Sequence, residues 1–219
     1  MKIETFISPY LGALCYLLKE DQHAVLIDPV ETKELEDTVE GLQIDYSLIT
    51  HEHWDHISGI PFSKKRGAQV VCGALCAEGL KNPKINGSRY ATQLATMMPE
   101  YGSDESLNVP EMVFYSDLIM QDGETLTWQD HIFRFYQTPG HSPGSCCILL
   151  DDNCLFSGDL LFLDRPTQYR WPGGNKKALL ISLEWAMSLN PDLLVYPGHF
   201  APFLLHESYE YKKRTGENK

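Results

Sequence analysis

The chain has 219 residues, 43% of them hydrophobic and 22% charged, and a formal net charge of −12 at pH 7. This length and composition are typical of a globular protein with a full hydrophobic core, and we expect one domain over residues 1–219. The acidic balance argues against a nucleic-acid partner, which would select a basic surface. No apolar run reaches about 18 residues, so the sequence predicts no membrane partner and no membrane-spanning helix.

The N-terminal residues Met1 to Thr5 lack the apolar stretch of a signal peptide, so we expect a cytoplasmic protein. The six cysteines form no Cys-x-x-Cys pair. In that compartment they are most simply buried free thiols.

The first fifty residues predict a strand-rich start. Compact apolar runs indicate strands at 13–18 and 24–28. A helix is expected at 32–41, with Thr32 as its N-cap, and a buried strand follows at 46–50. A strand, a helix and a strand in succession favour an α/β core.

The stretch 76–112 interrupts this pattern with turn signals, an expected helix at 88–101 and a polar loop. Long irregular connections are often lids over functional sites, so this segment is either a lid or a plain surface excursion. Regular elements resume after it. Strands are expected at 113–115, 124–128, 131–136, 145–150, 153–157 and 193–196, and a helix at 176–189.

A cluster of metal-binding residue types follows the strand at 46–50. Residues 51–56 read His-Glu-His-Trp-Asp-His, and His141 and His199 each follow a Pro-Gly pair. Asp159 follows Ser-Gly at the end of another predicted strand. Neutral imidazole and carboxylate are the ligands that first-row divalent metals prefer. We therefore expect a metal centre, with a pair of ions.

Six segments resemble, in their residues and in their order along the chain, the metallo-β-lactamase-fold hydrolases, and most closely the glyoxalase II-like group (hydroxyacylglutathione hydrolase-like). These segments are Ile27-Asp28-Pro29, 51–56, 138–145, 156–162, 171–174 and 196–199. The resemblance implies an αββα sandwich of two mixed β-sheets flanked by helices. It also implies which residues hold which ion. One ion would be held by His51, His53 and His141, the other by Asp55, His56 and His199, with Asp159 as the bridge.

Two further groups of residues have candidate roles. Asp28 is expected to orient a ligand histidine from behind, or else to form a turn at the end of its strand. Trp54, Tyr90, Tyr169 and Phe200 either line a pocket or belong to the core.

Such a centre predicts hydrolysis. Water held between two divalent ions loses a proton near neutral pH, and the resulting metal-bridging hydroxide can attack a carbonyl carbon. Asp55 and Asp159 are the candidate catalytic residues, because either can orient the nucleophile or carry a proton. Zinc is expected, and iron or manganese also suits these ligands.

A thioester of glutathione, coenzyme A or an acyl carrier is the expected small-molecule substrate, because a thiolate leaves with little acid assistance. The alternatives are a lactonase or other carboxylic ester hydrolase, and a non-catalytic member of the fold that binds a metabolite. The complete ligand set argues against the last. The sequence does not indicate an oligomeric state.

Overall fold

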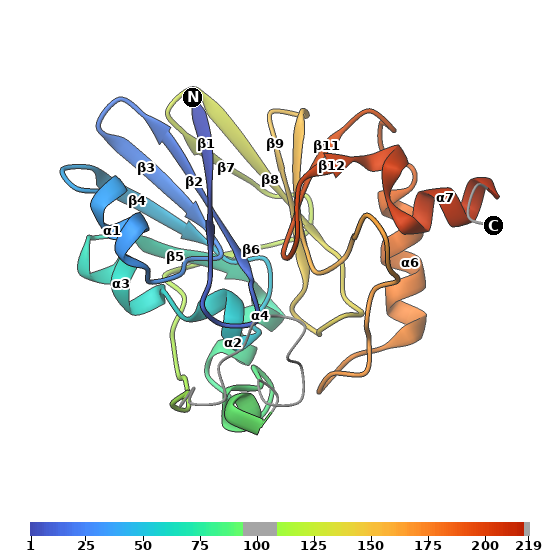
Figure 1. Ribbon diagram of the computed structural model, residues 1–219, viewed down its shortest axis with the longest axis horizontal. Helices are drawn as coiled ribbons and strands as arrows, with labels where there is room; N and C mark the ends of the chain where they lie inside the picture. The colour runs from blue at the N-terminus through green and yellow to red at the C-terminus, as the bar shows by residue number, and fades with distance from the viewer. Residues whose placement is uncertain (94–108, 217–219) are drawn as a thin grey trace.

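The computed structural model of the chain describes residues 1–93 and 109–216. Two six-stranded β-sheets face each other within these residues, with helices on their outer sides (Figure 1). Both sheets contain parallel and antiparallel neighbours, so both are mixed. The αββα sandwich expected from the sequence is therefore confirmed.

The first sheet has the order β1-β2-β3-β4-β5-β6. Its strands are β1 (Lys2–Ile7), β2 (Leu14–Glu20), β3 (His23–Ile27), β4 (Gln43–Leu48), β5 (Gln69–Gly73) and β6 (Leu118–Met120). Helices α1 (Lys33–Thr38) and α3 (Ile60–Lys65) lie on its outer face (Figure 1). Thr32 caps α1 as predicted, because its hydroxyl accepts a hydrogen bond from the Leu35 amide.

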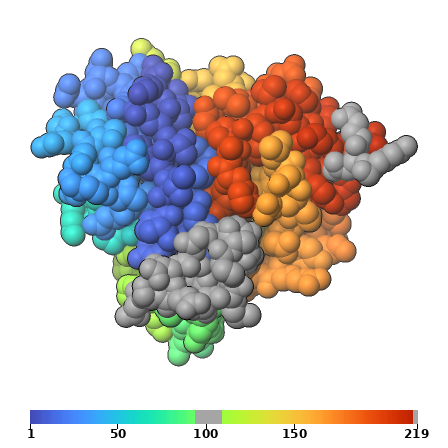
Figure 2. Space-filling view, viewed as in Figure 1, coloured from blue at the N-terminus to red at the C-terminus, as the bar shows by residue number. Residues whose placement is uncertain are grey.

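The second sheet has the order β12-β11-β10-β9-β8-β7. Its strands are β7 (Thr125–Trp128), β8 (His131–Gln137), β9 (Cys146–Leu150), β10 (Cys154–Gly158), β11 (Leu194–Pro197) and β12 (Phe203–Leu204). Helix α6 (Lys176–Ala186) packs on its outside, and α7 (Tyr209–Thr215) lies near the C-terminus (Figure 1). Figure 2 shows the blue N-terminal elements and the red C-terminal elements side by side across the molecule.

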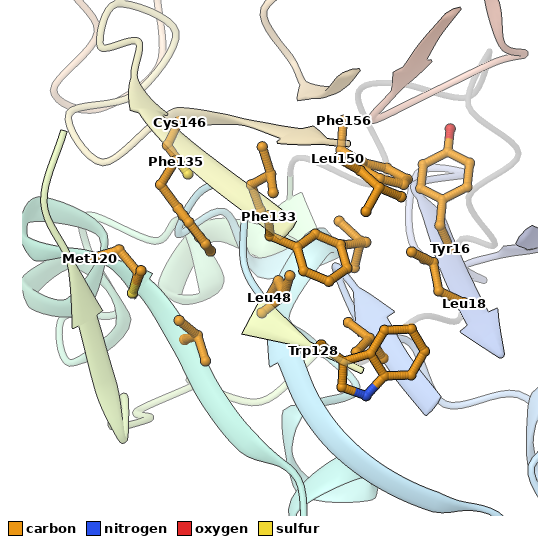
Figure 3. Packing of buried hydrophobic residues seen from close by; sticks show 14 of the residues in the cluster. Tyr16, Leu18, Leu48, Met120, Trp128, Phe133, Phe135, Cys146, Leu150 and Phe156 are labelled. Carbon is orange, nitrogen blue, oxygen red and sulfur yellow. The ribbon is translucent and has the colours of Figure 1, made fainter. Parts of the chain in front are cut away.

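The main core fills the space between the two sheets (Figure 3). Tyr16 and Leu48 from the first sheet meet Phe133 and Phe156 from the second, and each of these four side chains is at most 2% exposed. Burying one such side chain stabilises the fold by roughly 1.5–3 kcal/mol. This packing fixes the sheets relative to each other, and therefore fixes the loops that leave their edges.

Several sequence-based expectations differ from the structure in detail. No strand forms at 113–115, and the next strand after β5 is β6, which starts at Leu118. β1 and β5 were not expected. The helix predicted at 88–101 begins as a 3₁₀ turn over Ser88–Tyr90. The part of that helix after residue 93, and residues 94–108 of the possible lid at 76–112, lie outside the described residues. None of the described helices is long and apolar enough to cross a membrane.

Candidate metal centre

Four loops meet at one edge of the sandwich. The segment after β4 leads into 51–56, which ends in the short helix α2 (Trp54–Ile57). The loop after β8 contains His141, β10 leads into Asp159, and β11 leads into His199. Backbone hydrogen bonds tie these loops together, from the Cys146 amide to the Thr50 carbonyl (2.8 Å) and from the Gly198 amide to the Gly158 carbonyl (2.8 Å). Residues that are far apart in sequence thus share one small volume.

All seven predicted ligand residues come together there. Six are buried, and the side chain of the seventh, Asp159, is 11% exposed. The imidazoles of His51, His53 and His141 form one group, in which His141 Nε2 lies 2.9 Å from His53 Nδ1.

A second group consists of Asp55, His56 and His199. His199 Nε2 lies 3.3 Å from His56 Nε2 and 3.4 Å from Asp55 Oδ2. The two groups match the two ligand sets expected from the sequence.

Asp159 lies between the two groups. Its Oδ2 is 3.4 Å from His141 Nε2 in the first group and 3.6 Å from His199 Nε2 in the second. Its Oδ1 is 3.6 Å from His56 Nε2. A side chain on Gly198 would exclude this arrangement, because its Cβ would lie 2.2 Å from Asp159 Oδ1. Glycine at this position therefore lets the His199 loop approach the carboxylate.

Hydrogen bonds behind the cluster fix the ring tautomers. Asp28 accepts from Thr50 Oγ1 (2.6 Å) and from His56 Nδ1 (3.1 Å). The single hydroxyl proton of Thr50 is thereby used, so Thr50 Oγ1 accepts from His51 Nδ1 at 3.1 Å. His141 Nδ1 donates to the Gln168 carbonyl (2.7 Å). In their neutral forms, His51, His56 and His141 therefore all present an Nε2 lone pair to the centre of the cluster.

The cluster fits divalent metal ions on three observations. Buried His51 Nε2 and Asp159 Oδ1 have no hydrogen-bond partner among the described residues. His56 Nε2 lies 3.3 Å from His199 Nε2, so ring nitrogens from two distant loops converge on one point. Bonds of about 2.0 Å to a tetrahedral zinc ion place neighbouring ligand atoms about 3.3 Å apart, close to the 3.3–3.6 Å separations in the second group and at Asp159.

Burial and mutual repulsion act on the histidine pKa values. Burial, followed by the neighbouring imidazoles, lowers the pKa of His51 well below its usual value. Burial and His141 lower that of His53 to about 3. Burial also disfavours the charged form of His56, but Asp55 and Asp159 outweigh it and raise its pKa to about 10. His51 and His53 are therefore neutral at pH 7 and ready to bind a cation, whereas His56 must first lose a proton.

Potential metal-ligand atoms also lie close together in a third set, formed by Asp28, His51 and His56. We interpret this set as a hydrogen-bond network and not as a metal site. The Asp28 carboxylate already accepts from the Thr50 amide, the Thr50 hydroxyl and His56 Nδ1. The predicted contact between Asp28 and a histidine of the cluster is present, and it places Asp28 behind the site.

Glu52 has a position that its sequence context did not reveal. It is fully buried, and its carboxylate accepts from Ser142 Oγ (2.9 Å) and from the Gly144 amide (3.2 Å). Burial raises its pKa to about 7. Gly79 and Gly144 make room for it, because a Cβ on either would lie about 2.5 Å from Glu52 atoms. Glu52 thus links the 51–56 segment to the loop that carries His141.

A cavity of about 250 Å³ opens beside the cluster. His53, Asp55, His141, Asp159 and His199 form its polar floor. Its apolar wall includes Leu11, Trp54, Phe162, Trp171 and Phe200. Of the four aromatic residues considered from the sequence, Trp54 and Phe200 line this cavity. Tyr90 and Tyr169 are not among the described lining residues.

Two mixed sheets that bring histidines and carboxylates to one edge define the fold class of the metallo-β-lactamases. The family model described as "Metallo-beta-lactamase superfamily" matches residues 9–199, and the chain belongs to this superfamily. A solved structure of the BLEG-1 B3 metallo-beta-lactamase has the same fold, with a TM-score of 0.78, 24% identity and coverage of 94% of this chain and 95% of that one.

More informative similarities lie among proteins with higher identity. The chain is 28% identical to a "probable polyketide biosynthesis zinc-dependent hydrolase", BaeB of Bacillus velezensis, over 84% of this chain and 72% of that protein. It is 28% identical to a hydroxyacylglutathione hydrolase of Francisella tularensis subsp. novicida over 89% of this chain, but over only 65% of that enzyme. A structure of TTHA1623 in a di-iron-bound form has a TM-score of 0.72 and 27% identity, covering 97% and 98% of the two chains.

Proposed function

We propose that this protein is a metal-dependent hydrolase that cleaves thioesters. The position of Asp159, within 3.4–3.6 Å of nitrogens from both histidine groups, is the observation that supports it most. His51, His53 and His141 would hold one divalent ion, and Asp55, His56 and His199 the other, with Asp159 shared. The zinc-dependent hydrolase and the di-iron structure among the similar proteins support a pair of such ions.

Bound divalent ions would lower the pKa of water toward about 7 and polarise a carbonyl oxygen. The protein's own residues supply position and proton handling. Asp55 is 5% exposed and borders the cavity, so its carboxylate can orient the attacking water and accept its proton. Thr50 and Asp28 hold His51 and His56 with their Nε2 atoms toward the centre.

The lining of the cavity favours a thioester over substrates with poorer leaving groups. Among the described lining residues, every carboxyl and imidazole belongs to the metal cluster. Within the described part of the lining, no carboxyl or imidazole outside the cluster is therefore placed to protonate a departing amine or alkoxide. A thiolate, with a pKa near 8.5, departs at neutral pH without such help.

The proposal is tested by elemental analysis and substrate profiling of the purified protein. We expect zinc, iron or manganese at about two ions per chain, turnover of S-lactoylglutathione or an acyl-coenzyme A, and loss of turnover on His53→Ala. A homoserine lactone and a phosphodiester are the comparison substrates. Preferential lactone cleavage would replace the thioesterase proposal with lactonase activity, and turnover that survives both a chelator and His53→Ala would refute it.

A further inference from the structure

The cavity beside the cluster contains two bulky apolar residues with unusual backbone conformations. Leu11 has φ = 52° and Phe200 has φ = 73°, in the left-handed region that glycine adopts freely and bulky residues avoid. Asp28, in the hydrogen-bond network behind the histidines, also has a positive φ (50°). The remaining described non-glycine residues with positive φ occupy hairpin turns between strands: Asp21, Gln129, Asp151 and Asp152.

Core packing does not account for Phe200. Its side chain is 46% exposed, so burial compensates only in part for the unfavourable backbone. The segment before β2 holds the backbone next to Phe200 in place. The Leu14 amide donates to the Gly198 carbonyl (2.7 Å), and Ala13 forms an isolated antiparallel β-bridge with His199. Strain of this kind is concentrated at ligand-binding sites, where the surrounding structure maintains it.

The Phe200 ring contacts one aromatic ring and one guanidinium group. Its centroid lies 6.1 Å from that of Phe162, and Arg165 Cζ lies 4.1 Å from it. The Arg165 guanidinium also pairs with Asp164 (2.9 Å), so its charge is partly balanced. This side of the cavity therefore presents the Phe162 and Phe200 rings to a ligand, with the Arg165 guanidinium beside them.

Two polar groups of the described lining are already engaged within the fold. Asn86 donates through Nδ2 to the Met112 carbonyl (2.9 Å) and accepts from the Ser88 amide (2.9 Å). The Gln168 carbonyl accepts from His141. The remaining charged lining residues besides Arg165 belong to the metal cluster. Most described lining residues outside the cluster are apolar, so a ligand group with several hydroxyls would lose hydration here and regain few hydrogen bonds.

We propose that this cavity binds an apolar acyl group, and that Phe200 and Leu11 determine this specificity. The inference rests on the proposed thioester hydrolysis and names its substrate class. An extended hydrocarbon or aromatic acyl chain would lie against Leu11, Phe162 and Phe200, with its carbonyl toward Asp159. A lactoyl group is too short and too polar to use this wall.

The test compares acetyl, butanoyl, hexanoyl and octanoyl thioesters of N-acetylcysteamine. For the wild type we expect kcat/KM to rise by two- to fourfold with each added methylene, fourfold corresponding to about 0.8 kcal/mol. Phe200→Gly should lower the octanoyl-to-acetyl ratio at least tenfold, and Phe200→Leu should restore most of it. Gln129→Gly is the matched control, because it also replaces a residue with positive φ (50°) but lies in an exposed hairpin turn. It should leave the ratio unchanged.

A binding measurement separates this inference from the proposed reaction. The probes are the uncleavable thioethers S-octyl- and S-ethyl-N-acetylcysteamine, titrated calorimetrically into the zinc-reconstituted protein. Octyl preference that Phe200→Gly abolishes supports the apolar site even if no thioester is turned over, in which case only the hydrolysis proposal fails. The inference would be overturned by equal affinity for both probes or by an octyl preference that Phe200→Gly leaves unaffected. Faster turnover of lactoyl than of hexanoyl thioesters would also overturn it.

Discussion

Asp28 Oδ2 lies 3.1 Å from His56 Nδ1 and 2.6 Å from the hydroxyl of Thr50, which in turn contacts His51. One buried carboxylate therefore orients a histidine from each proposed ligand group. A carboxylate behind a ligand histidine fixes its tautomer and increases its basicity. Metal affinity at both positions should depend on a residue that contacts neither ion.

Asp28→Asn should weaken metal binding by about 10- to 100-fold. The amide nitrogen of asparagine would face donors, so His56 or Thr50 would lose its acceptor and the rings would turn. Competition with a fluorescent zinc chelator measures the affinity directly. Asp45→Asn is the control, because Asp45 binds His23 and Trp128 at another place in the fold. An unaltered affinity in Asp28→Asn would contradict the role given to this residue.

Replacing a histidine that belongs to only one group should remove one ion and leave the other. His199→Ala removes a donor from the group of Asp55 and His56, so we expect the metal content to fall from about two ions per chain to about one. Elemental analysis after dialysis measures this ratio. His206→Ala, which removes a histidine bonded to the Pro191 carbonyl, should retain the full content. Equal metal content in wild type and His199→Ala would exclude His199 as a ligand.

The residues that meet at this edge of the sandwich could be named from the sequence, because their types and spacing are those of metal ligands. Three histidines and an aspartate within 51–56 have few structural explanations, and Pro-Gly pairs mark His141 and His199 as loop residues. Distances between these loops, and the position of Asp159 between both groups, depend on how the sheets pack. Local sequence does not contain that information.

Other features were missed for identifiable physical reasons. Glu52 looks like a solvated charge in sequence, and its burial depends on two glycines, Gly79 and Gly144, that are distant along the chain. The run 113–115 has the composition of a strand, yet Val113 and Tyr115 are exposed and pair with no neighbour strand. β-propensity reflects a suitable pleated surface, and only the tertiary fold decides which run occupies the sheet edge.

Metal binding should release a proton from the group that contains His56. In the metal-free protein, burial opposes its charge but Asp55 and Asp159 raise its pKa to about 10, so the ring is protonated at neutral pH. An incoming ion must displace that proton, and affinity should rise about tenfold per pH unit below this pKa. His53, with a pKa of about 3, is already neutral and releases none. Calorimetric titration in buffers of different ionisation enthalpy measures the release, and a binding heat independent of buffer would refute it.

Glu52 should make the metal-free protein less stable as pH rises. Burial raises its pKa from 4.5 to about 7, so the folded state holds a proton that the unfolded chain has already lost. Unfolding releases that proton, and the free energy of unfolding therefore falls between these two pH values, by about 3 kcal/mol at most. Below pH 4.5 the carboxyl is protonated in both the folded and the unfolded state, so it does not change the stability with pH. Above about pH 7 it is ionised in both states, and the folded state carries the full cost of the buried charge.

Glu52→Gln isolates this effect, because the amide has nearly the same shape and does not titrate. It loses one acceptor for Ser142 or Gly144, which costs about 1 kcal/mol at all pH values. Urea unfolding from about pH 5 to about pH 8 should show the wild type more stable at the acidic end, with the difference shrinking or reversing toward the basic end. Glu78→Gln, on an exposed side chain, should give a flat difference. A flat difference for Glu52→Gln as well would show that this carboxyl ionises without penalty, and that the contact with Ser142 stabilises its charged form.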